Sequence, residues 1–167
     1  MWRNWARTAS ADPALVTAPA DDAEVAALVR WAGARDVRVR AVGAGHSFTD
    51  CAVTDGALLH LDALNRVEHV GPAAPDGSRE VRVGAGIRLR RLCAELDARG
   101  LALENMGDID AQSIAGAIST GTHGTGARLG GFATQVRALR LADARGEIVE
   151  CSPTERPELY ELARLGL

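Results

Sequence analysis

The sequence predicts an α+β fold, on three observations. A helical pattern at residues 21–33 leads into the alternating strand "VRVRAV" at 37–42, giving a β-α-β order early in the chain. Hairpins with helices follow, instead of a continued alternation of strands and helices. The length of 167 residues fits one domain, 1–167, with two α+β subdomains at about 1–70 and 71–167.

The first helix has recognisable start and stop signals. Asp21 and Glu24 have the spacing of a capping box, although Asp replaces the more usual Ser or Thr. Gly33 offers an end to the helix. The apolar residues between them mark a single helical face, namely Val25, Leu28, Val29 and Ala32.

The later elements follow from similar signals. A strand is expected around 58–61, and strands at 66–70 and 79–86 are joined by the turn "GPAAPDGS". Apolar residues at 87, 89, 92 and 96 predict a helix that stops at Gly100. Residues 101–131 are mostly Gly, Ser, Thr and small apolar residues, and no regular element is assigned to them. A hairpin that turns at "DARG" is expected over 136–151. A short helix closes the chain, with Ser152 or Thr154 as its cap.

The composition excludes several classes of function. The net charge is −3 and all 19 basic residues are arginine, so no basic field points to nucleic acid or an anionic membrane. Three widely spaced cysteines form neither a disulfide framework nor a zinc spacing, which favours a reducing cytoplasm. The N-terminus lacks the apolar core of a signal peptide, and no run of 18 apolar residues predicts a membrane span.

The first motif is "VGAGHSFTD", Val42 to Asp50. A dinucleotide fingerprint needs a third glycine where Phe48 stands, and a P-loop needs a lysine. Two interpretations remain. The loop is a plain turn at a strand end with His46 partly exposed, or its glycines adopt positive φ so that successive N–H groups converge on a pyrophosphate.

The second motif is "SIAGAISTGTHGTGA", Ser113 to Ala127. Its glycines leave the backbone bare and its hydroxyls surround them, which suits close approach to a flat or phosphorylated ligand. A simple loop explains one or two of these glycines, but less readily the whole run. His123 is more typical of a loop histidine than of a catalyst, and His60 and His69 lie in strands without an assigned role. A zinc site of His46, His60 and His123 has no supporting spacing.

These pieces together resemble one family. The chain resembles the FAD-binding (PCMH, vanillyl-alcohol-oxidase-type) domain of the sugar-1,4-lactone and alditol oxidases, including D-arabinono-1,4-lactone and L-gulonolactone oxidases. The resemblance covers nearly all 167 residues in the expected order. It rests on "NWA", "VRVRAVGAGHSF", "TDGALLHLDALNRV", "VRVGAGIRLRRLCAELDARGLALENMGDIDAQSIAGAISTGTHGTGA" and "VRALRLADARGEIVECSP".

The resemblance implies an FAD site. The histidine of the G-x-G-H-S loop, here His46, is expected to be bonded covalently to the 8α-methyl carbon of FAD. The pyrophosphate is expected against residues 41–47, which are Ala41, Val42, Gly43, Ala44, Gly45, His46 and Ser47. The rest of FAD is expected against Asp108, Ser113, Gly116, Ile118, Ser119, Gly121 and His123. A carboxylate is unfavourable near phosphates, so Asp108 is expected at a ribose or at the flavin edge.

The resemblance also implies an activity. The family oxidises a hydroxyl of an aldono-1,4-lactone or an alditol, passes a hydride to the flavin, and reoxidises it with O₂ to give H₂O₂. By resemblance, Gly107 borders the edge of the flavin where oxygen arrives, which predicts an oxidase. A turn glycine needed only for backbone geometry is the alternative for Gly107.

The family normally continues into a second domain that covers the substrate and supplies the base. That domain is expected to be missing here, so the chain alone is expected to be catalytically incomplete. Two other interpretations remain, a flavin-binding module without catalysis and a different FAD enzyme of the same fold.

Overall fold

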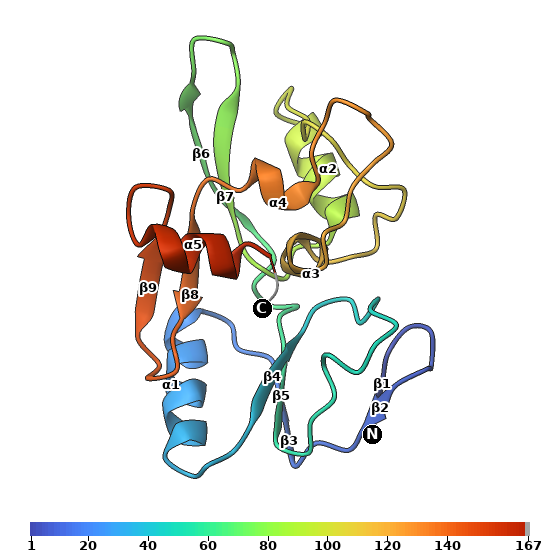
Figure 1. Ribbon diagram of the computed structural model, residues 1–167, viewed down its shortest axis with the longest axis vertical. Helices are drawn as coiled ribbons and strands as arrows, with labels where there is room; N and C mark the ends of the chain where they lie inside the picture. Colours follow the sequence, from blue (N-terminus) through green and yellow to red (C-terminus); the bar gives the residue numbers. More distant parts are fainter. Residues whose placement is uncertain (166–167) are drawn as a thin grey trace.

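The computed structural model describes residues 1–165 and has the α+β class that the sequence predicts (Figure 1). The N-terminal part is built around a three-stranded parallel sheet in the order β3-β5-β4. A two-stranded antiparallel hairpin, β1–β2, precedes this sheet. The elements are β1 (Trp2–Arg3), β2 (Ser10–Ala11), β3 (Leu15–Thr17), α1 (Asp22–Gly33), β4 (Val39–Val42) and β5 (Ala57–His60).

The central strand of this sheet is the most buried. Ala57 and Leu58 are fully buried and Leu59 is 4% exposed, because β5 has a hydrogen-bonded neighbour on each side. Helix α1 connects β3 to β4, so the predicted β-α-β order is confirmed. Its start is also as predicted, since Asp21 Oδ1 accepts the Glu24 N–H at 2.9 Å. The Glu24 carboxylate reaches back to accept the Ala20 N–H at 2.7 Å.

The following residues form the predicted hairpin and helix. Strands β6 (Val67–Ala73) and β7 (Arg79–Val83) pair antiparallel, and α2 (Leu89–Asp97) follows them. β6 runs further than expected, through two register irregularities into residues assigned to the turn. The apolar face of α2 packs in the larger core, formed by Ile87, Leu89, Leu92, Leu96, Ile114, Ala117 and Phe132.

Residues 101–131, to which the sequence assigned no regular element, contain one helix. Residues Ile114–Ser119 form helix α3, and a second short helix, α4 (Phe132–Gln135), follows the loops. The Ser113 side chain caps α3 by accepting the Gly116 N–H at 3.4 Å. Ile114 and Ala117 are buried in the core, so tertiary packing outweighs the low helix propensity of the small residues.

The last elements are the hairpin β8 (Leu139–Ala142) and β9 (Ile148–Cys151) and the helix α5 (Pro157–Ala163). The predicted cap of α5 is wrong. Its N-cap is Arg156 with no side-chain bond, and Pro157 fixes the first turn instead. Ser152 accepts the Glu155 N–H at 3.0 Å within the preceding turn.

The β8–β9 hairpin packs on α1, although the two are far apart in sequence (Figure 1). Arg30 donates to the Gly146 carbonyl at 2.7 Å. In β8, Arg140 pairs with Asp22 at 2.8 Å and with Glu68 at 3.3 Å. One arginine therefore links α1, β6 and β8.

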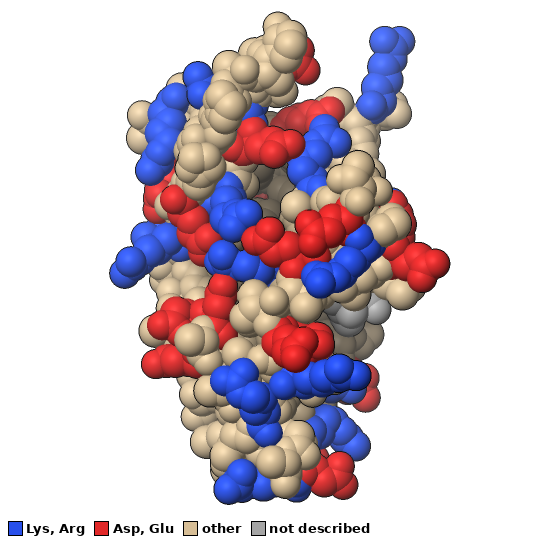
Figure 2. Space-filling model, turned by 90° about the vertical axis from the view of Figure 1, so that its left-hand side faces the viewer, with Lys and Arg blue, Asp and Glu red and all other residues tan. Residues whose placement is uncertain are grey.

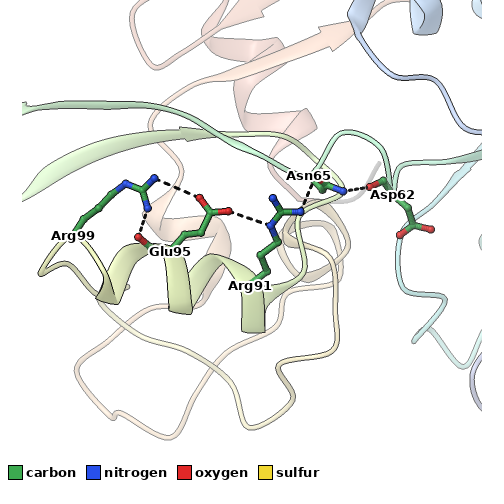
Figure 3. A network of polar contacts seen from close by, with 5 residues as sticks. All are labelled: Asp62, Asn65, Arg91, Glu95 and Arg99. Carbon is green, nitrogen blue, oxygen red and sulfur yellow. Dashed lines mark hydrogen bonds and ion pairs between the residues drawn. The ribbon is translucent and has the colours of Figure 1, made fainter.

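The segment between β5 and β6 joins the two parts of the molecule. Asp62 pairs with Arg88, and its carbonyl accepts from Asn65, which accepts from Arg91 at 2.9 Å. Figure 3 shows the chain of contacts from Asp62 through Asn65 and Arg91 continuing to Glu95 on α2 and to Arg99, just beyond the end of that helix. These side chains are largely exposed, so each pair contributes little to stability. Backbone packing of Gly84 and Gly86 against the same segment contributes more to stability.

Gly84 and Gly86 lie directly against this segment. Gly86 N donates to the Leu64 carbonyl at 2.8 Å, and Gly84 N donates to the Arg66 carbonyl at 2.9 Å. A Cβ on Gly86 would stand 1.7 Å from the Leu61 carbonyl oxygen. The glycines at 84 and 86 therefore allow this backbone to pack directly against the backbone of residues 61–66.

Charges on the face shown in Figure 2 are mixed, with acidic and basic side chains interspersed. Within residues 1–165, no helix is long and apolar enough to cross a membrane.

We expect Gly86→Ala to destabilise the protein by about 2 kcal/mol or more, because the backbone at Leu61 would have to move. Gly33→Ala is the matched control, since Gly33 has no atom within 4 Å of its Cβ position and ends a helix. It should be neutral or stabilising by up to about 1 kcal/mol. Urea denaturation measures both. Equal stability of the two variants would contradict the close fit.

Candidate functional site

The loop after β4 has a row of unused donors. In the described residues, none of the five backbone N–H groups from Gly43 to Ser47 donates a hydrogen bond. All five residues are half-buried. Buried N–H groups are rarely left without partners, so a half-buried row of them suits an anionic ligand. Gly45 has φ +68°, as the ligand-binding interpretation of this loop requires of a glycine.

The two glycine-containing motifs meet at one point. A Cβ on Gly43 would stand 1.8 Å from Ser113 Oγ and 2.8 Å from Ser113 Cβ. Ser113 is 1% exposed and caps α3. The structure therefore brings the first motif against the start of the second, across 70 positions of sequence.

The N–H groups at the start of α3 are already bonded. Ile114 N donates to the Ile87 carbonyl at 2.9 Å and Ala115 N to the Ala85 carbonyl at 3.1 Å. Gly116 N donates to Ser113 Oγ. The free N–H donors for an anion therefore come from the first motif. The second motif offers half-exposed residues for contact with a ligand, among them Ile118 and Ser119.

Gly121 ends α3 in the left-handed conformation, with φ +66°. Gly121 N donates to the Ile118 carbonyl at 3.3 Å and Thr122 N to the Ala117 carbonyl at 3.1 Å. This pair of bonds is a Schellman motif, so the end of the helix by itself explains why residue 121 is a glycine.

Gly107 and Gly124 pack loops together. A Cβ on Gly107 would lie 3.1 Å from the His123 carbonyl oxygen and 3.1 Å from Thr122 Cγ2. A Cβ on Gly124 would lie 2.5 Å from the Met106 carbonyl oxygen. The segment at 105–107 therefore lies directly against the second motif, and Gly107 is buried there.

The polar candidates near these loops are exposed. The His123 side chain has Nδ1 at 2.9 Å from the Gly124 carbonyl oxygen, and Asp108 lies at the surface. At the other end of the site, Val42 is 4% exposed and belongs to a core cluster with Ala52 and Leu58. Val42 can therefore contribute only its backbone to a ligand.

Gln112 is a site feature that the sequence did not single out. Its Nε2 donates to Thr122 Oγ1 at 3.1 Å. Its Oε1 is buried and has no hydrogen-bond partner in the described residues. An unpaired buried oxygen costs free energy, which a donor from a ligand would offset. Sequence reasoning did not find Gln112, because no motif or spacing marks this residue as a binding group.

Cysteine chemistry is disfavoured beside Gly107. Cys93 Sγ lies 3.3 Å from Met106 Sδ. Burial, and after it the negative charge of Asp110, raises the pKa of the Cys93 thiol. The thiol therefore stays protonated near neutral pH and is a poor nucleophile. All three cysteines are free.

A metal centre also lacks support in residues 1–165, where no three His, Cys, Asp or Glu side chains are grouped to bind an ion. His60 lies in β5, 3.8 Å from Asp62, and His69 is exposed on β6. The His46, His60 and His123 combination is not assembled.

Comparison with known proteins identifies the family of this chain. Residues 13–152 match the family described as FAD binding domain. The chain belongs to this FAD-binding family. The computed structure is also similar to 6-hydroxy-D-nicotine oxidase from Arthrobacter nicotinovorans, with a TM-score of 0.81 and 26% identity. That similarity covers 98% of this chain and 35% of the other.

Similar sequences include named lactone enzymes. This FAD-binding chain is 43% identical over its whole length to L-gulono-1,4-lactone dehydrogenase of Mycobacterium tuberculosis, of which it covers 37%. It is 40% identical to L-gulonolactone oxidase of Bos taurus, covering 99% of this chain and 37% of that protein. For D-arabinono-1,4-lactone oxidase of Eremothecium gossypii the identity is 40%, with 31% of that protein covered. The chain thus spans about a third of these relatives.

We expect Gly43→Ala to destabilise the protein by about 1–3 kcal/mol, because the new methyl group overlaps the Ser113 side chain. Ser113→Gly removes that side chain and costs only a few tenths of a kcal/mol as a change of N-cap.

The double variant should therefore recover most of the stability lost in Gly43→Ala. A double-mutant cycle by urea denaturation measures this coupling. Additive effects would show that Gly43 and Ser113 do not make this contact.

Proposed function

We propose that this chain is the flavin-binding part of a sugar-1,4-lactone oxidase, with FAD attached covalently to His46. The observation that carries the proposal is the row of five N–H groups from Gly43 to Ser47, in half-buried residues, that have no acceptor within residues 1–165. A pyrophosphate supplies the negative oxygens that such a row binds. Membership of the FAD-binding family supports the choice of this ligand.

The residues of the chain would divide the task of holding FAD. The backbone of residues 41–47 would hold the pyrophosphate. The rest of the molecule would contact the half-exposed side of α3 and the loops beside it, at Ser113, Gly116, Ile118, Ser119, Gly121 and His123. Bound FAD would supply a two-electron acceptor for a hydride from a substrate C–H bond. The protein would position that acceptor and exclude water from it.

His46 would hold the cofactor through a bond from an imidazole nitrogen to the 8α-methyl carbon. Forming that C–N bond would release the imidazole proton and one methyl proton, and the two electrons would leave through bound FAD to O₂, giving H₂O₂. His46 is half-buried, so its ring is partly open to a ligand.

The substrate class is inferred from similar proteins. Relatives at 40–43% identity are named as enzymes of L-gulono-1,4-lactone, L-gulonolactone and D-arabinono-1,4-lactone. We infer an aldono-1,4-lactone with a free hydroxyl as substrate. Because the chain spans only part of these relatives, the complete reaction is proposed for the lactone enzyme as a whole.

The electron acceptor separates two kinds of enzyme. Relatives include both a dehydrogenase and oxidases, so identity alone does not choose between them. Gly107 carries the choice of oxidase. We propose that it borders the flavin edge that oxygen reaches, as the family resemblance implies. It is buried between loops, where a Cβ would lie 3.1 Å from the His123 carbonyl oxygen and 3.1 Å from Thr122 Cγ2, so a larger residue would alter this edge.

The variant His46→Ala should bind FAD without forming a covalent bond, so that acid releases all its flavin. The unmodified chain should retain fluorescent flavin on denaturing electrophoresis. His69→Ala is the matched control, because this histidine is exposed on β6 and should leave the attachment intact. Flavin that resists extraction from His46→Ala would rule out His46 as the attachment point.

Gly107→Val should slow reoxidation of the reduced flavin by O₂ at least about tenfold, because we propose this position at the flavin edge that oxygen reaches, and a larger side chain would displace the loops there. Stopped-flow mixing of dithionite-reduced holoprotein with oxygenated buffer measures the rate. Gly33→Ala serves as control. A rate unchanged in Gly107→Val would leave Gly107 with a packing role only.

A further inference from the structure

The hairpin β1–β2 lies against the His46 loop, and the proposed function gives it no role. Asn4, in the turn of this hairpin, is 3% exposed. Its Nδ2 donates to the Ser47 carbonyl at 2.8 Å and to Thr8 Oγ1 at 2.8 Å, and its Oδ1 accepts the Ala9 N–H at 3.1 Å. The Asn4 side chain is held in one position by these partners, because a buried polar atom left unpaired would cost free energy.

Three hydrogen bonds from this hairpin reach the loop on both sides of His46. Trp5 N donates to the Gly45 carbonyl at 2.8 Å, Asn4 to the Ser47 carbonyl, and Thr8 Oγ1 to the Phe48 carbonyl at 2.9 Å. In a trans peptide the C=O and N–H groups point in opposite directions, and the chain has no cis peptide in its described part. Holding the Gly45 and Ser47 carbonyls therefore turns the N–H groups of His46 and Phe48 away from the hairpin.

The hairpin also contacts the His46 ring. The indole of Trp5 is stacked on the imidazole, with ring centroids 5.0 Å apart and planes inclined by 14°. Phe48 meets the same indole edge-on at 6.3 Å. Stacking of this kind restrains the plane of the imidazole ring.

The exposure of these rings fits such a role. Trp5 is 64% exposed and Phe48 67%, so neither contributes much to a buried core. The two exposed rings form one cluster with His46, and a contiguous exposed patch marks an interaction site more often than a single exposed residue does. At Gly45 a Cβ would make only ordinary contacts with this hairpin, 3.5 Å from the Trp2 ring and 3.9 Å from Trp5 N, so the φ of +68° is what favours glycine there.

We propose that Trp5 is a positioning residue for His46, orienting the imidazole for attachment to FAD, and that Asn4 anchors the loop in which His46 lies. The inference rests on the proposed covalent role of His46. It adds a second requirement, because a histidine with free rotation about χ1 and χ2 would reach the bonding orientation less often.

The test uses the 167-residue chain, purified as apoprotein and mixed with FAD. Trp5→Leu should slow the formation of covalent flavin about tenfold, with total bound flavin unchanged, because orientation alone is lost. Trp5→Phe keeps an aromatic face and should restore most of the rate. Trp31→Leu is the matched control, since Trp31 is 37% exposed on α1 and packs on Arg35 instead.

A second readout needs no flavin. In the apoprotein, NMR signals of the His46 ring protons should show the ring-current shift of an adjacent indole. Trp5→Leu should abolish this shift, while Trp31→Leu should preserve it. A Trp5→Leu variant with an unchanged attachment rate, or with unchanged His46 signals, would overturn the positioning role alone. An unmodified chain that binds only extractable FAD would instead refute the covalent function, and with it the role of Trp5 in attachment.

Discussion

The close approach of Gly43 to Ser113 is the constraint on which the arrangement of this site depends. It brings the end of a parallel strand against the cap of α3, and no side chain larger than hydrogen fits at Gly43 while Ser113 is present. Because Ser113 is buried and α3 contributes Ile114 and Ala117 to the core, the strand end is placed relative to the larger core. The donors of the loop thereby acquire a fixed position beside α3.

The glycines of the chain serve two physical purposes. Gly43, Gly86 and Gly124 allow backbones or side chains to approach at distances that a Cβ would prevent. Gly45 and Gly121 instead adopt positive φ, the first in the donor loop and the second at the end of α3. A glycine-rich stretch in this fold therefore reflects packing as well as ligand binding, and the two reasons occur side by side in the same motif.

Local patterns predicted the regular elements well and the long-range contacts poorly. The Asp21 and Glu24 spacing and the apolar face of α2 depend on neighbours in sequence, and both are present as predicted. The strand predicted at 37–42 forms only over 39–42, and its alternation ends at Ala41, which is exposed, before the buried Val42. Helix α3 was missed because its stability comes from core contacts, which no local pattern encodes. Asn4 and Trp5 were quoted only as part of a family resemblance, since their partners lie about 40 positions away. The family was predicted correctly because many weak motifs occur in one order, although no single motif is specific.

The contact between α1 and the β8–β9 hairpin has a consequence for synthesis on the ribosome. Arg30 and Gly146 are 116 positions apart, and Arg140 returns to Asp22 in the same helix. Helix α1 emerges early, yet its partner surface is translated more than a hundred residues later. Contacts of such long range are slow to form, because a large loop must close first. The nascent N-terminal part therefore keeps this face of α1 uncovered for seconds, at ribosomal rates of about 5–20 residues per second, and is exposed to chaperones and aggregation until the hairpin arrives.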